Sequence, residues 1–412
     1  MSVTTNAAGT PAQGAPDPAS DASAGRLPLR IGLGWARPNI PAAAIALLVA
    51  AILPPLAFNN YWLHVLVIAC AYGVVNMAWN LVLGVSGIWS FAQIAIFAIG
   101  GYTSGLLCTH LGMSPWLGML FGGLVAMVVG ILLGIPAFRV TGIYVALLTF
   151  AFNEVVRLLI VADDKNGITG GAFGLGGIPG FFDKSAGEVP YYLLGLALLT
   201  ISSLVVWRIM YSPIGMAFAS LRENPRYAVG RGIDPFKYQL LVFGISSFLT
   251  GIAGAFYASY LSIIQPQIMG LALSTNLLAM IVIGGMGTFS GPLVGTLVLS
   301  GLLEVLKSTE QLRLIVLGVI LLVIIVAMPD GLVGGFARAR SALSRWISEG
   351  DRPAEAAADG EAAVPDGGTA VGADDPTEAV AAPGSVAGTE LETAQHPAGD
   401  PFAPTTGRDE ER

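Results

Sequence analysis

The chain has 412 residues, of which 54% are hydrophobic and 11% are charged, and its mean hydropathy is +0.72. These values exclude an ordinary soluble globular protein, because several apolar runs reach the roughly 20 residues that a helix needs to cross a hydrocarbon core about 30 Å thick. The formal net charge of −7 comes from the end of the chain, since the segment after Ser348 holds 15 acidic and three basic side chains.

The apolar runs predict an all-α, polytopic membrane protein with about ten transmembrane helices. The alternating pattern that is typical of a membrane β-barrel does not occur in the sequence. The expected spans lie near residues 41–58, 61–84, 88–108, 115–135, 143–161, 190–210, 238–262, 270–286, 290–307 and 311–328. The sequence leaves open whether 270–286 and 290–307 form one long span or two short helices, broken at the glycine-rich run 284–291.

Two tails flank a transmembrane domain that is expected over residues 39–346. Residues 1–38 and 347–412 are rich in Ala, Gly and Pro, and the second tail is also acidic. Such segments bury too little apolar surface to offset the entropy of ordering, so both tails are expected to be disordered. An inert, solvated C-terminal tail is favoured over a docking role.

Basic residues in the loops predict the orientation in the membrane. They cluster before the first span, between spans four and five, between spans six and seven, and after the tenth span. These residues are Arg26, Arg30, Arg37, Arg139, the group from Arg208 to Lys237, and Arg338, Arg340 and Arg345. An even number of spans places all of them on one face, so both termini are expected to be cytoplasmic.

The segment from Ser220 to Tyr238 holds four of the 20 Lys and Arg residues of the chain. Its pattern predicts two short helical pieces, with Pro225 in the first turn of the second piece and a turn at Gly230 and Gly232. Three interpretations stay open on composition alone. The segment could fix topology, lie as an amphipathic helix on anionic lipid, or insert into a groove of a cytoplasmic partner.

Polar side chains at membrane depth mark candidate positions along a transport pathway. Gln93 lies in the third span, Asn153 and Glu154 lie near the middle of the fifth, and Asn276 lies at the external start of the eighth. Hydrogen bonding between helices is the competing interpretation for the amides. For Glu154, the competing interpretation is a structural ion pair with Arg157, three residues further on.

Glycines in the run 284–291 are the candidate hinge positions: Gly284, Gly285, Gly287 and Gly291. Small residues allow helices in a membrane to approach closely, and this alone accounts for most glycines of the chain. In this run they could also permit the local bending that a transporter needs when it alternates between two open states.

The chain offers no set of catalytic residues. It has no GxxxxGK[ST] sequence to hold phosphate, no HExxH or CxxC metal motif, and only three scattered histidines. No cofactor, no metal site and no nucleic-acid partner are therefore expected on this chain.

Five blocks of sequence closely resemble the permease subunits of branched-chain amino-acid ATP-binding cassette (ABC) transporters, and together they span most of residues 60–330. In chain order, they are the glycine-rich run between Val85 and Leu107, "RVTGIYVALLTFAFNEVVRLL", the loop Thr169 to Pro179, the run Leu221 to Ala258, and "IVIGGMGTFSGPLVG". The resemblance implies the ABC-importer permease fold.

The resemblance also implies a role for the charged segment, as a coupling helix that docks into an ATP-binding subunit. The residues of this loop are Arg222, Glu223, Asn224, Ala228, Gly230 and Gly232. The implied assembly in the bacterial inner membrane contains two ATP-binding subunits, a second similar permease and an extracytoplasmic substrate-binding protein. ATP would be hydrolysed by the partner subunits.

The implied function is import of leucine, isoleucine or valine by alternating access. Within the same family, urea, short amides or other amino acids are alternative substrates. An ion-coupled secondary transporter is the alternative from a different class, and it would need no ATP-binding subunit.

Overall fold

The computed structural model describes residues 59–140, 142–163, 167–183 and 187–309, with the isolated positions 50, 52, 54–55, 318–319, 322 and 331–335. Contacts divide the chain into the units Met1–Gly350 and Asp351–Arg412, and all the described residues belong to the first. The predicted tails 1–38 and 347–412 and most of the predicted spans 41–58 and 311–328 lie outside the described residues.

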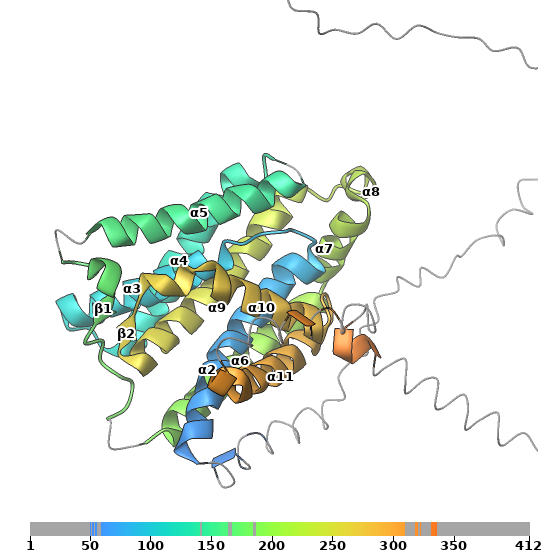
Figure 1. The fold of residues 1–412 in the computed structure, drawn as a ribbon. Coiled ribbons are helices and arrows are strands. Elements are labelled where there is room, and N and C mark those ends of the chain that lie inside the picture. Colours follow the sequence, from blue (N-terminus) through green and yellow to red (C-terminus); the bar gives the residue numbers. More distant parts are fainter. Residues whose placement is uncertain are drawn as a thin grey trace, which may run out of the picture. The chain divides into compact units, whose positions relative to one another are not determined.

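Six described helices are long and apolar enough to cross a membrane, which confirms the prediction of an all-α multi-pass protein (Figure 1). They are α2 (Asn60–Asn80), which continues as the π-helical turn η2 (Leu81–Val85), α3 (Gln93–Leu111), α4 (Pro115–Ala137), α5 (Ile143–Ala162), α6 (Val189–Met210) and α9 (Pro235–Leu261). The predicted number of ten spans is not confirmed, because two of the ten lie largely outside the described residues.

Two shorter apolar helices follow, α10 (Leu271–Gly284) and α11 (Gly291–Val305). They pack side by side, and the chain turns between them at the glycine-rich run (Figure 1). The sequence left open whether this region forms one long span or two short helices, and the structure shows two short helices. At about 1.5 Å per residue, helices of 14 and 15 residues are shorter than the hydrocarbon core.

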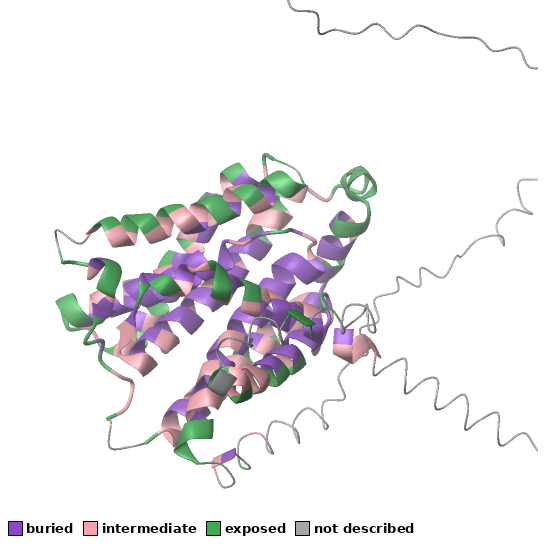
Figure 2. Ribbon diagram, viewed as in Figure 1, coloured by how far each residue is buried: buried purple, intermediate pink, exposed green. Residues whose placement is uncertain are grey.

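Helices α2, α3 and α9 form the centre of the bundle, and α5 lies at its edge. The most apolar window of α2 with η2 is 78% buried, whereas that of α5 is only 17% buried. Figure 2 shows the same difference, because buried residues dominate α2 and α3 while α5 is largely exposed or intermediate. A membrane or a partner protein must therefore cover α5.

Glycines set the distance between the central helices α3 and α9. A Cβ atom on Gly254 would lie 1.9 Å from the carbonyl oxygen of Phe97, and one on Gly100 would lie 2.3 Å from that of Gly251. Because lipid tails are as apolar as the helices, close backbone packing is a main source of helix association in a membrane.

The loop between α5 and α6 is packed rather than flexible where it is described. Its strand β1 (Leu175–Gly176) pairs antiparallel with β2 (Ile263–Ile264), and the short helix η6 (Pro266–Met269) leads on into α10. Leu175 and Ile264 are buried against the glycines of α3. These short strands are an addition to the all-α fold that the sequence did not predict.

We expect Gly254→Ala to lower the thermal stability of the purified protein, because the added methyl group would force α3 and α9 apart. Overpacking of this kind costs about 1–3 kcal/mol. Gly301→Ala is the matched control, since a Cβ on Gly301 of α11 meets nothing within 4 Å. Equal melting temperatures for the two variants, measured by fluorescence-detected size exclusion after heating, would contradict this packing account.

Candidate functional site

The charged segment between α6 and α9 folds into two short helices, α7 (Pro213–Glu223) and α8 (Pro225–Gly230). Asn224 separates them, and its Oδ1 accepts a hydrogen bond of 3.1 Å from the backbone N–H of Tyr227. Pro225 is the first residue of α8 and Gly232 has a φ of +83°, which confirms the predicted helix start and turn.

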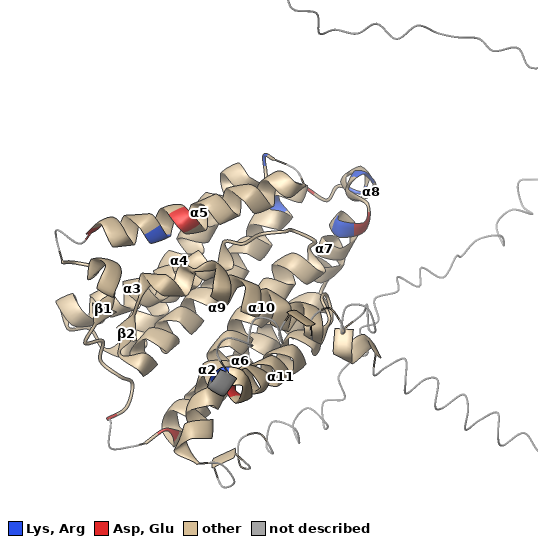
Figure 3. Ribbon diagram, in the orientation of Figure 1, with Lys and Arg blue, Asp and Glu red and all other residues tan. Residues whose placement is uncertain are grey.

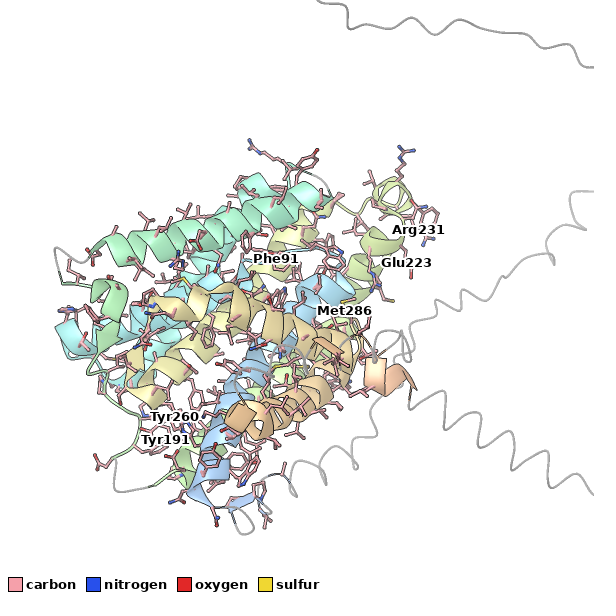
Figure 4. The ribbon with its side chains drawn as sticks, in the orientation of Figure 1. Phe91, Tyr191, Glu223, Arg231, Tyr260 and Met286 are labelled. Atoms are coloured by element: carbon pink, nitrogen blue, oxygen red, sulfur yellow. The ribbon has the colours of Figure 1, made fainter. Side chains whose placement is uncertain are left out.

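Polar and apolar side chains share the outer surface of this segment. Glu223, Arg226 and Tyr227 are exposed, whereas Ala228 is buried. Figure 3 shows charged residues gathered at this end of the bundle, and Figure 4 labels Glu223 and Arg231 there. Such a mixed surface, with Tyr227 58% and Val229 52% exposed, suits contact with a protein. Sequence reasoning missed these two residues, although two large apolar side chains within a charged segment are a signal.

Arg222 is exposed like its neighbours, but its guanidinium also reaches the membrane-spanning helices. Its Nη1 donates a hydrogen bond to the carbonyl oxygen of Gly84 in the π-helical turn η2. Its methylene groups pack so closely on Gly87 that a Cβ there would lie 2.8 Å from the Cγ of Arg222. A residue that was predicted only to dock therefore also binds the end of α2.

Asn80 joins the same end of α2 to the loop between α10 and α11. Its Oδ1 accepts a hydrogen bond of 2.8 Å from the N–H of Gly287, and its Nδ2 donates one of 2.9 Å to the carbonyl oxygen of Thr288. A Cβ on Gly287 would lie 3.2 Å from Nη1 of Arg222. We call Asn80, Gly84, Arg222 and Gly287 the latch, because together they connect α7, α2 and the α10–α11 loop.

The other predicted hinge glycines make close contacts between α10 and α11. A Cβ on Gly284 would lie 1.9 Å from the carbonyl oxygen of Gly291, and one on Gly291 would lie 2.3 Å from that of Gly285. Gly285 has a φ of +118°, a conformation that side chains rarely adopt. Close packing and the turn therefore explain why glycine occupies these positions. That the chain bends at this run during transport stays a prediction.

The structure places Gln93 inside the bundle, where it bonds α3 to α9. Its Nε2 donates to Ser246 Oγ at 2.8 Å, and its Oε1 accepts from Thr250 Oγ1 at 2.9 Å. Ser246 in turn donates to the carbonyl oxygen of Ala78 at 2.8 Å. Gln93 is fully buried, so its geometry is that of the competing interpretation, hydrogen bonding between helices.

Asn153 and Glu154 are neighbours on α5 but have different surroundings. Asn153 is buried, and its Nδ2 donates to the carbonyl oxygen of Met269 in η6 at 2.9 Å. Glu154 lies on the outer face and pairs with Arg157, whose Nε is 3.0 Å from Oε2. The two side chains of this pair are 44% and 34% exposed. The ion pair of the competing interpretation is therefore formed between two partly exposed side chains. Figure 3 shows the acidic and the basic position next to each other along α5.

Asn276 lies apart from the other three predicted pathway residues. It lines a cavity of about 190 Å³ between α2, α10 and α11, together with His64, Glu304 and Lys307. Sequence reasoning missed these three residues, although Glu304 and Lys307 are conspicuous charges at the end of an apolar run. Among the described residues, no group of three His, Cys, Asp or Glu is placed to hold a metal ion.

We expect Gln93→Ala to lower thermal stability, because it removes two hydrogen bonds between helices, each worth about 0.6 kcal/mol on average. Transport per folded molecule should stay within about twofold of the wild type, since the side chain reaches only α9. Gln267→Ala is the control for loss of an amide, because Gln267 is exposed and makes one bond of 3.3 Å. Unchanged stability with lost transport would assign Gln93 to the pathway instead.

Comparisons with known proteins agree with this architecture. Residues 61–325 match the family described as branched-chain amino acid transport system / permease component. The chain is 29% identical over 315 residues to the high-affinity branched-chain amino acid transport system permease protein LivM of Escherichia coli, covering 70% of this chain and 74% of the relative. No solved structure matches the chain.

Two further relatives also carry names of branched-chain amino acid transport permeases. The probable branched-chain amino acid transport permease protein LivM of Methanocaldococcus jannaschii is 24% identical over 313 residues, which cover 64% of this chain and 90% of the relative. The LivH permease of Salmonella typhimurium is 23% identical over 289 residues, with 64% and 91% covered. With its membrane-spanning helices and this match over most of its length, the chain is a multi-pass membrane protein that belongs to the branched-chain amino-acid transport permease family.

Proposed function

We propose that this chain is one of two similar permease subunits that together import branched-chain amino acids by alternating access. In this assembly, two ATP-binding subunits hydrolyse ATP, and an extracytoplasmic binding protein delivers the substrate. The chain sits in the bacterial inner membrane with both termini in the cytoplasm. The names of the relatives support the substrate and the second permease, and the absence of a phosphate-binding motif from the sequence supports separate ATP-binding subunits.

The latch is the observation that carries this proposal. In it, α7–α8 is the coupling segment, and the exposed Glu223, Arg226 and Tyr227 contact an ATP-binding subunit. The shape of the segment comes from its other predicted residues. Asn224 caps α8, Ala228 is buried, and the chain turns at Gly230 and Gly232. Arg222 then transmits the movement, because it binds the carbonyl oxygen of Gly84 inside the membrane-spanning bundle.

The moving elements in this proposal are the short helices α10 and α11. Asn80 holds their connecting loop by two hydrogen bonds, so a pull on η2 reaches the loop directly. Gly284, Gly285, Gly287 and Gly291 supply the hinge. Two-state elements of this kind convert a small displacement at one site into a larger one elsewhere.

The proposed route for the substrate passes between these helices and their neighbours, close to Asn276. Gln93 and Asn153 contribute by fixing the helices that border the route. Glu154 and Arg157 lie on the open face of α5, where a lipid environment would disfavour charges by about 2.5–3.5 kcal/mol each on insertion scales. We therefore assign this face to contact with the second permease subunit.

The experiment that tests the function is uptake by the complex, purified by a tag on this chain and reconstituted with its binding protein. Wild type should co-purify with ATP-binding subunits and import leucine, but not urea. Arg222→Gln should still bind those subunits, but lose stimulation of ATP hydrolysis by substrate and import leucine at least about tenfold more slowly. Arg139→Gln is the charge-matched control and should remain coupled, because Arg139 is exposed and lies between α4 and α5, outside the coupling segment.

Three outcomes would count against the proposal. Recovery of the chain without ATP-binding subunits would favour an ion-coupled secondary transporter. Import of urea in place of leucine would leave the assembly in place but change the substrate. Normal coupling in Arg222→Gln would remove the latch from the mechanism.

A further inference from the structure

A cavity of about 190 Å³ lies where one face of α2 meets α10 and α11. Its polar lining includes Tyr72, His64, Asn276, Ser300, Glu304 and Lys307, and its apolar lining includes Ile68, Leu273 and Leu303. The cavity therefore has a charged part, with side chains of both signs, and an aliphatic wall. It lies near the ends of α2 and α11, away from the latch.

The cavity holds an ion pair between Glu304 and Lys307, and among the described residues only Glu304 is held in place by a further contact. The side chain of Glu304 is 18% exposed, and its carboxylate accepts hydrogen bonds from the hydroxyl of Tyr61 and, at 3.2 Å, from Nζ of Lys307. Lys307 is 62% exposed, so its ammonium group has room to move. A ligand can therefore separate the pair without moving Glu304.

Two further polar groups complete the binding capacity. The Oγ atom of Ser300 is buried and has no hydrogen-bond partner among the described residues, so it is free to bond a ligand in the cavity. His64 is fixed by the hydroxyl of Tyr260, which lies 2.5 Å from Nδ1 and donates to the carboxylate of Glu188 at 2.5 Å. The cavity thus has an oriented polar end.

The aliphatic wall and the size of the cavity limit the ligand further. Ile68, Leu273 and Leu303 come from three different helices, so the wall surrounds a small apolar group. Apolar cavities of about 150 Å³ bind benzene, and leucine is larger than benzene by only a few heavy atoms. A cavity of about 190 Å³ suits a molecule of that size.

We propose that this cavity binds an aliphatic α-amino acid during transport. Glu304 receives the ammonium group, Lys307 receives the carboxylate, and Ser300 and Asn276 complete the hydrogen bonds. The side chain lies against Ile68, Leu273 and Leu303. This inference rests on the proposed function and adds a substrate site on the permease itself.

The proposed site has a low affinity for its ligand, and a low affinity suits transport. A zwitterion loses hydration on entry, and the pairs that it forms replace an existing ion pair. A transported solute must bind well enough to enter and weakly enough to leave. Two walls of the cavity are α10 and α11, whose connecting loop belongs to the latch, so movement of the coupling segment would change the shape of the cavity.

The test is equilibrium binding of radiolabelled leucine to the complex of this chain with the second permease and the ATP-binding subunits. The complex is studied in nanodiscs, without binding protein or nucleotide. The competitors are isocaproate, which is leucine without its amino group, and isoamylamine, which is leucine without its carboxyl group. Urea serves as the unrelated competitor.

We expect Glu304→Gln to raise the Kd for leucine at least about tenfold and leave the Kd for isocaproate unchanged. Lys307→Met should raise the Kd for leucine by a similar factor and leave the Kd for isoamylamine unchanged. Lys237→Met is the matched control, because Lys237 forms a comparable i, i+3 pair with Asp234 at 3.4 Å, outside the cavity. A general loss of fold would weaken the binding of all ligands together. A variant that affects leucine but spares one analogue therefore has a defect in binding and not in stability.

Two results would overturn the inference. If the complex imports leucine but Glu304→Gln and Lys307→Met bind it as tightly as the wild type, the site is elsewhere and the proposed function still stands. If leucine is neither bound nor imported, both the site and the proposed function fail.

Discussion

The hydrogen bond from Arg222 to the carbonyl oxygen of Gly84 is the contact on which the functional architecture depends. It is made at a position where the helix changes from α to π geometry. There the N–H groups of Ser86 and Ile88 bond to Leu81 and Val82, at 3.1 and 3.0 Å. Arg222 thereby supplies a donor to Gly84. A membrane-spanning fold needs such compensation, because an unpaired backbone group in an apolar environment costs several kcal/mol.

The latch also explains why the short helices sit where they do. Asn80 is fully buried, and its side chain satisfies one N–H and one C=O group of the loop between α10 and α11. The loop would otherwise bring unpaired backbone groups to the end of the bundle. The same bonds that complete the fold therefore connect the exposed segment α7–α8 to the helices that border the cavity.

Local chemistry allowed much of this fold to be predicted from the sequence. Apolar runs located the six long helices, and Pro225 with the following glycines located α8 and its turn. The direction of Arg222 was not predictable, because it depends on a carbonyl group 138 residues away in the sequence.

The candidate pathway shows the same limit. Asn153 and Glu154 are adjacent, and only the position of α5 at the edge of the bundle determines that one is buried and the other partly exposed. The cavity combines residues of three helices that are separated in sequence, so no local motif indicates it. Composition identifies polar residues at depth, but packing decides which of them bond helices together.

The central claim is that the latch carries movement from α7 to α10 and α11. The most direct measurement is the distance between spin labels on the exposed Leu193 of α6 and Leu271 of α10, in the assembled complex with Cys70 and Cys108 replaced by Ala. Addition of ATP should shift this distance in the otherwise wild-type complex, and Arg222→Gln should abolish the shift. The same shift in both complexes would contradict the account.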